Sequence, residues 1–246
     1  MFVSIFEQVN TSFKRNVETG KHMSAEQKPK AFSFRNTKFV TSSPDIARLP
    51  NNTGAEIAFI GRSNSGKSSS LNAICDQKNL AKTSRTPGRT QLINLFKITD
   101  DRHLVDLPGY GYAAVPEQMK RQWQHNMTNY LRQRRELTGL VLTMDIRTPL
   151  KDHDRLIIDW TIAAQIPLLI LLTKCDKLGV NARKEAVGEV RSLLSEFAGT
   201  FTIIAFSALK KIGVEEARQI IKSWFEAYEM DPTTKIDDTD QQITED

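Results

Sequence analysis

The chain has 246 residues, of which 39% are hydrophobic and 26% charged, and its net charge at pH 7 is +5. This composition suits one globular domain with a substantial core, and no apolar stretch approaches the ~20 residues of a membrane span. The two cysteines, Cys75 and Cys175, lack the spacing of metal ligands. We therefore expect a cytoplasmic protein in a reducing compartment, with no membrane partner.

The two ends of the chain differ in composition from its middle. Residues 1–34 are polar with isolated apolar side chains, and Met23 is an alternative start. Residues 230–246 are acidic, so the rest of the chain is more basic than the overall charge indicates. We expect a flexible N-terminal extension over 1–34, one domain over 35–229 and a flexible acidic tail over 230–246.

Strands and helices are predicted to alternate along the domain. Hydrophobic periodicity and turn residues predict strands over 37–41, 56–60, 91–99, 103–106, 140–144, 168–172 and 201–206. The predicted helices are 44–49, 69–74, 116–135, 152–164, 182–197 and 214–228. This order indicates an α/β fold of three layers, with a mostly parallel central sheet and helices on both faces.

Residues 61–68 match a phosphate-binding loop between a predicted strand and a predicted helix. Two glycines allow successive backbone N–H groups to face the α- and β-phosphates, and the dipole of the following helix favours the same anion. Lys67 then reaches the β/γ-phosphates, and the Ser68 hydroxyl can bind Mg²⁺. The alternative, an ordinary Gly/Ser-rich turn, is disfavoured by the flanking elements. The predicted nucleotide-binding residues are Gly61, Arg62, Ser63, Asn64, Ser65, Gly66, Lys67 and Ser68.

Basic residues gather in the polar segment 76–89, which suits a mobile functional loop, and in the helix predicted over 116–135. Such charge favours a polyanionic partner such as RNA, and a solvated helix face is the alternative. The residues concerned are Lys82, Arg85, Arg89, Lys120, Arg121, Arg132, Arg134 and Arg135.

Two further motifs follow predicted strands, at the edge where parallel sheets bind ligands. In the first, the Asp106 carboxylate can hold a water of the Mg²⁺ shell and the Gly109 N–H can meet the γ-phosphate. In the second, the Asp176 carboxylate can accept from guanine N1–H and the exocyclic amine, while the Lys174 stem packs along the purine; adenine offers no such donor pair. The predicted site residues are Asp106, Leu107, Pro108, Gly109, Thr173, Lys174, Cys175 and Asp176, with Phe206, Ser207 and Ala208 near the guanine O6.

The order of these motifs is that of a P-loop GTPase, and their details resemble the bacterial EngB/YihA/YsxC family over about residues 38–228. The resemblance lies in residues 61–64, 86–91, 106–112 and 173–176. It implies a GTPase of the TrmE-Era-EngA-YihA-Septin-like type that binds GTP and GDP, assists assembly of the large (50S) ribosomal subunit, and is needed for normal cell division and septation. The implied partner is the large subunit, through its rRNA, and we expect a monomer.

The resemblance also implies site residues in the segment after the first helix. Thr90 would be the switch threonine that joins Ser68 and Asp106 on Mg²⁺, and it would act in catalysis with Lys67 and Gly109. The other residues implied to approach the nucleotide are Gly88, Arg89, Gln91 and Leu92. Cys175 stands where the family more often has alanine or another small residue, a change that should leave the base contacts intact.

Tyr110 stands where many signalling GTPases place a glutamine that orients the attacking water, so slow intrinsic hydrolysis is expected. Asn64 resembles an asparagine that binds a monovalent cation in some relatives, so stimulation by K⁺ is a secondary hypothesis. Two other functions remain open at this point. A division-site regulatory GTPase would share every motif but act on a protein, and a small-molecule kinase would have no use for the motif at 173–176.

Overall fold

The computed structural model describes residues 32–51, 54–82, 92–111, 117–195 and 201–230. Nearly all of the predicted N-terminal extension and acidic tail lies outside these ranges, as do the predicted site residues Gly88, Arg89, Thr90 and Gln91. The account below concerns the described residues of the unit Phe32–Asp246.

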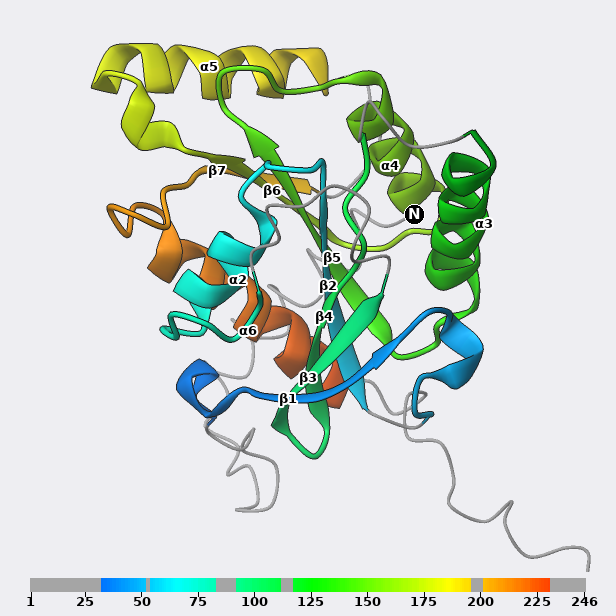
Figure 1. Cartoon of the computed structure of the whole chain (residues 1–246). Helices are drawn as coiled ribbons and strands as arrows, with labels where there is room; N and C mark the ends of the chain where they lie inside the picture. The colour runs from blue at the N-terminus through cyan, green and yellow to red at the C-terminus, as the bar shows by residue number, and fades with distance from the viewer. Residues whose placement is uncertain (1–31, 52–53, 83–91, 112–116, 196–200, 231–246) are drawn as a thin grey trace, which may run out of the picture. The chain divides into compact units, whose positions relative to one another are not determined.

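A seven-stranded sheet forms the centre of this unit, in the order β1-β3-β4-β2-β5-β6-β7 (Figure 1). Strands β4, β2, β5, β6 and β7 pair in parallel, whereas β3 is antiparallel to both β4 and β1. The mostly parallel sheet predicted from the sequence is therefore confirmed. The strands are β1 (Lys38–Ser43), β2 (Ala55–Gly61), β3 (Ile93–Thr99), β4 (Arg102–Asp106), β5 (Leu137–Asp145), β6 (Leu168–Thr173) and β7 (Phe201–Ala205).

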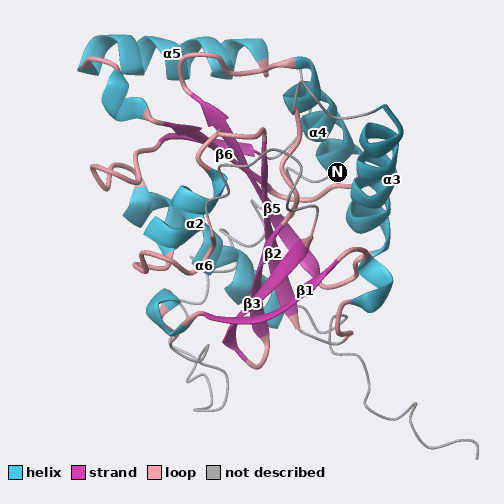
Figure 2. Ribbon diagram, viewed as in Figure 1, coloured by secondary structure: helices cyan, strands magenta, loops and turns pink. Residues whose placement is uncertain are grey.

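Helices lie on both faces of the sheet (Figure 2). They are α2 (Lys67–Ile74), α3 (Glu117–Gln133), α4 (Asp152–Ala163), α5 (Val180–Leu193) and α6 (Val214–Met230), with short 3-10 turns at Phe34–Asn36, Ile46–Arg48 and Cys175–Lys177. The helix predicted over 44–49 is one of these turns: it has three residues and is capped by the Asp45 side chain, which accepts from the Arg48 N–H at 3.2 Å.

At the end of α5, Leu193 is 55% exposed, whereas the following Leu194 is fully buried. The reason is geometric, because Leu194 lies four residues after buried Val190, whereas position 193 points away from the sheet.

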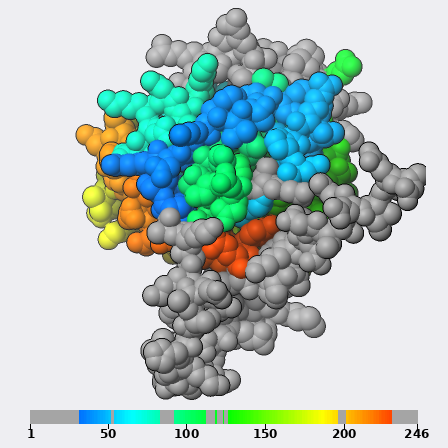
Figure 3. All heavy atoms as spheres, turned by 90° about the horizontal axis from the view of Figure 1, so that it is seen from below, coloured from blue at the N-terminus to red at the C-terminus, as the bar shows by residue number. Residues whose placement is uncertain are grey.

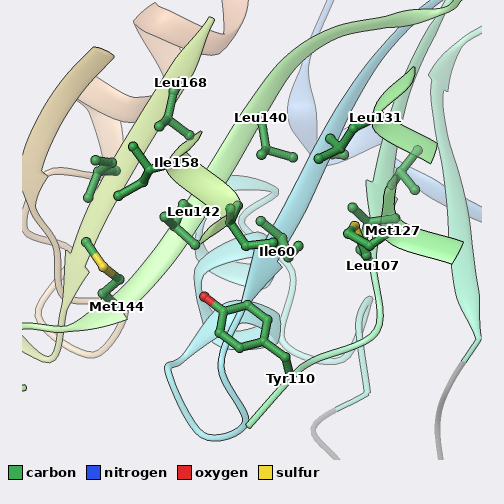
Figure 4. Close-up of a cluster of buried hydrophobic side chains, with 14 of the residues drawn as sticks. Ile60, Leu107, Tyr110, Met127, Leu131, Leu140, Leu142, Met144, Ile158 and Leu168 are labelled. Atoms are coloured by element: carbon green, nitrogen blue, oxygen red, sulfur yellow. The ribbon is translucent and has the colours of Figure 1, made fainter. Parts of the chain in front are cut away.

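Alternation along the central strands builds two apolar cores, one on each face of the sheet. In β2, Ala58 and Ile60 join α3, α4 and α5 in one core, which Figure 4 shows around Ile60, Leu142 and Ile158. Ile57 and Phe59 point to the other core, with side chains of α2 and α6. A strand that is buried on both faces shows no polar alternation, which is why β2 reads as a continuous apolar run.

The antiparallel edge strand β1 remains partly exposed beside the β3–β4 hairpin (Figure 3). Phe39 is 55% and Val40 42% exposed, and the register of β1 with β3 shifts between Phe39 and Thr41. A bulge of this kind interrupts a regular edge and disfavours pairing with a further strand.

A buried ion pair lies at the amino-terminal end of β2. Glu56 has no exposed surface, and its Oε2 accepts from Arg134 Nε at 2.9 Å and from the Tyr130 hydroxyl at 3.2 Å. Arg134 also donates to the Pro50 carbonyl at 2.7 Å. The interpretation of Arg134 as part of an exposed basic cluster was wrong, because its guanidinium is committed to the core. Arg132 and Arg135 are exposed, as predicted.

We expect Arg134→Met to destabilise the fold by about 3 kcal/mol, because it leaves the Glu56 carboxylate buried without its cation. Urea unfolding measures the change, and Arg135→Met, at the exposed neighbouring position, is the matched control with an effect within about 0.5 kcal/mol. Equal losses for the two variants would contradict this account of the pair.

Candidate nucleotide-binding site

The predicted phosphate loop connects β2 to α2 and passes very close to β5. A Cβ added to Gly61 would lie 2.1 Å from Thr143 Oγ1, so only glycine fits there. Gly66 has φ 92° and Asn64 φ 63°, both in the left-handed region. Gly66 begins α2 without a side chain to cap it, and the first-turn N–H groups of a helix form a binding site for an anion.

Threonines at the ends of β5 and β6 hold this loop. Thr143 Oγ1 lies 2.7 Å from Ser65 Oγ, and Thr173 Oγ1 donates to the Ser65 carbonyl and, at 3.0 Å, to the Met144 carbonyl. Gly61, Ser65 and Thr173 are therefore buried and shape the loop from behind. The sequence analysis did not identify Thr143, and a threonine within an apolar strand gives no local signal of such a role.

Lys67 and Asp106 form an ion pair beneath the loop. Asp106 ends β4, and Lys67 begins α2, so the sheet brings together the two residues that the sequence assigned to the phosphates and to Mg²⁺. Their side chains are only 12% and 8% exposed, which strengthens the attraction between them.

A pocket of about 1130 Å³ opens above these residues, large enough for a nucleotide. Twelve of the predicted site residues line this pocket: eleven come from the phosphate loop, the Asp106 motif and position 174, and Leu92 lies just before β3. They are Arg62, Ser63, Asn64, Gly66, Lys67, Ser68, Leu92, Asp106, Leu107, Pro108, Gly109 and Lys174.

The predicted base-recognition residues meet beside Lys174. Asp176 Oδ1 accepts from the Ser207 hydroxyl at 2.6 Å, and this bond lowers the pKa of the Asp176 carboxyl. The Cys175 N–H donates to the Phe206 carbonyl at 3.1 Å, which joins the loop after β6 to the loop after β7. The Cys175 side chain is buried, and burial raises the pKa of its thiol, so this residue supports the loop from the core.

The Gly109–Tyr110 segment is tied to the phosphate loop through its backbone. The Ser63 N–H donates to the Tyr110 carbonyl at 2.7 Å. The Tyr110 side chain is only 3% exposed and points into the core (Figure 4), where its hydroxyl donates to Asp154 in α4 and its ring contacts Trp123. Burial and the nearby Asp154 carboxylate raise the pKa of Tyr110. The phenol therefore faces away from the pocket.

The oxygen donors of the site fit Mg²⁺. The Ser68 hydroxyl and the Asp106 carboxylate line the same pocket, and Mg²⁺ prefers one or two such protein oxygens together with phosphate oxygens. Thr90, the third predicted ligand, lies outside the described residues.

A phosphate loop after a central strand, an Asp-x-x-Gly segment and a Thr-Lys-x-Asp loop at one edge of a parallel sheet define a P-loop GTPase. Comparison with known proteins agrees: the model of a family described as 50S ribosome-binding GTPase matches residues 56–174. The chain belongs to the EngB family of GTP-binding proteins. It is 54% identical over 206 residues to a probable GTP-binding protein EngB of Salmonella paratyphi C, covering 84% of this chain and 97% of that protein.

Other relatives and solved structures give the same result. A probable GTP-binding protein EngB of Pectobacterium carotovorum is 54% identical over 198 residues, 80% of this chain and 94% of that protein. A crystal structure of a probable GTP-binding protein engB superposes with a TM-score of 0.57 at 20% identity, over 70% of this chain and all of that one. Aquifex aeolicus Era gives 0.52 at 19% identity, over 69% and 56%. At such identities the structures support the fold alone.

Within the described residues, none of the helices is both long enough and apolar enough to cross a membrane.

We expect Tyr110→Phe to lower the free energy of unfolding by about 1.5 to 3 kcal/mol, because it removes a buried hydrogen bond to a carboxylate. The rate of GTP hydrolysis at saturating GTP should stay within about twofold of the original, since the hydroxyl faces the core. Urea unfolding and phosphate release measure the two quantities. Unchanged stability with a large loss of hydrolysis would instead place the phenol at the attacking water.

Proposed function

We propose that this protein is a guanine-nucleotide switch with slow GTPase activity that assists assembly of the large (50S) ribosomal subunit and is needed for normal cell division and septation. The observation that carries the nucleotide part is the Asp176 carboxylate, held by Ser207 next to a phosphate loop. The description of the matching family model as a 50S ribosome-binding GTPase supports the ribosomal part.

Guanine specificity follows from the proposed role of Asp176. An ionised carboxylate is an acceptor only, and guanine presents N1–H and the exocyclic amine side by side. Adenine would leave this acceptor without donors, which costs more than a missing contact alone. The lowered pKa of the carboxyl keeps it ionised at neutral pH.

Phosphate binding would exchange partners at Lys67. The ammonium group now faces Asp106, and in the proposed complex it turns to the β/γ-phosphates. Ser68, Asp106 and Thr90 would then hold Mg²⁺, which neutralises charge on the phosphates, and the Gly109 N–H would meet the γ-phosphate. No described side chain in the pocket is placed as a general base, so we propose slow intrinsic hydrolysis and acceleration by a partner. Stimulation by K⁺ at Asn64 remains a secondary proposal.

The proposed partner is rRNA, bound mainly through its phosphates by a chain with a net charge of +5. We propose a monomer that acts in the cytoplasm. The second candidate function is a division-site regulatory GTPase that acts on a protein. The same nucleotide site serves both, and cross-linking in cell extract separates them by whether RNA or protein is captured.

Replacing Asp176 by Asn should weaken GDP binding at least tenfold, because the amide offers a donor where guanine also offers donors. Xanthosine diphosphate, which has a carbonyl in place of the amine, should gain affinity. Calorimetry with GDP, xanthosine diphosphate and ADP measures this change of base preference. ADP binding as tight as GDP binding by the original protein would contradict the proposed base site.

In a second test, the protein should pellet with large ribosomal subunits in the presence of a non-hydrolysable GTP analogue and not with GDP, because the γ-phosphate orders the segments that form the contact. Raising the salt from 50 to 200 mM should weaken the complex by at least tenfold. Association that depends on neither the nucleotide nor the salt concentration would contradict an rRNA-binding switch.

A further inference from the structure

Asp145 ends β5 directly beside the base-recognition loop and has no assigned role. Its register partner in the sheet is Thr173, the first residue of the motif at 173–176. Its side chain is only 16% exposed. The position therefore faces the loop that carries Lys174 and Asp176, although 29 or more residues separate them in the chain.

The carboxylate of Asp145 binds two cations, Arg147 and Lys174. Arg147 Nε lies 2.9 Å from Oδ1 and Arg147 Nη2 lies 2.6 Å from Oδ2, which makes a bidentate pair. Lys174 Nζ lies 3.0 Å from the same Oδ2. The hydrogen bonds from Arg147 hold the pKa of the Asp145 carboxyl well below its usual range, so the charge that attracts Lys174 persists at neutral pH.

Lys174 then continues the connection to the phosphate loop, because its Nζ also donates to the Asn64 carbonyl at 2.7 Å. Both residues have left-handed backbones, with φ 56° at Lys174 and φ 63° at Asn64. Non-glycine residues in this region persist only where their surroundings fix them. The ammonium group joins the two strained loops, and Asp145 anchors the ammonium group.

We propose that Asp145 is a positioning residue for nucleotide binding: it holds the end of Lys174 so that the aliphatic stem lies flat where the purine packs and the phosphate loop keeps its shape. This inference rests on the proposed guanine-nucleotide site. Arg147, half-exposed at the rim, completes the hydrogen bonds of the Asp145 carboxylate and is secondary to it.

The test compares single variants and one double variant of the full chain by calorimetry with GDP. Asp145→Asn should weaken GDP binding about tenfold, since it replaces a charged acceptor by a neutral one. At saturating GTP the hydrolysis rate should stay within about twofold, because the reacting phosphate is not touched. Glu215→Gln is the matched control, because Glu215 is 72% exposed, pairs with Arg218 and does not line the nucleotide pocket, so its loss should leave GDP affinity unchanged.

A double-mutant cycle separates positioning from general structural damage. Lys174→Met should weaken GDP binding more than Asp145→Asn does, and adding Asp145→Asn to it should cost less than twofold further, because the residue being positioned is gone. Full additivity would overturn the proposal. So would a larger loss for Arg147→Met than for Asp145→Asn, which would make the guanidinium the working group.

The same measurements distinguish an error in the proposed base site from an error in the role proposed for Asp145. Should Lys174→Met retain normal GDP affinity, the proposed nucleotide site itself is wrong. Should Lys174→Met lose affinity while Asp145→Asn, folded by circular dichroism, retains it, only the role of Asp145 is wrong.

Discussion

The parallel pairing of β4, β2, β5 and β6 is the constraint on which the site depends, because it puts the carboxyl ends of four strands at one edge of the sheet. At the carboxyl end of each of these four strands lies a residue that belongs to the site. Lys67 meets Asp106 and Lys174 meets Asn64 only because of this edge. No single loop contains enough of the site to bind a nucleotide.

The protein itself holds the phosphate loop in shape, and this has an energetic consequence. The hydroxyls of Thr143 and Thr173 fix the loop at Ser65, so little conformational entropy remains to be lost on binding. The Lys67–Asp106 pair opposes binding, because a phosphate must replace the Asp106 carboxylate as the partner of Lys67, and both side chains are largely buried. The preorganised loop therefore makes the free energy of nucleotide binding more favourable, and the cost of separating one ion pair makes it less favourable.

The features that could be predicted from the sequence are those that depend on residues close together in the chain. Strand and helix positions follow from periodicity, and the phosphate loop follows from spacing within eight residues. The features that it did not predict depend on partners far along the chain. From the sequence alone Arg134 resembles a surface arginine, because its partner Glu56 lies 78 residues away in the chain, and the role proposed for Asp145 depends on its contact with Lys174. The orientation of Tyr110 likewise depends on Asp154, 44 residues later.

Tyr110 shows how the proposed switch can be stable and responsive at once. Its backbone carbonyl accepts from the phosphate loop at Ser63, while its ring is packed in the core and its hydroxyl is bound to α4. A shift of Gly109 toward a γ-phosphate would therefore pull on a residue that is anchored at both ends. Such a shift must either stay small or repack the contact with α4, because a close-packed core does not deform continuously. The same anchoring keeps the phenol away from the pocket, so the coupling to α4 and the proposed slow unassisted hydrolysis would have one structural cause.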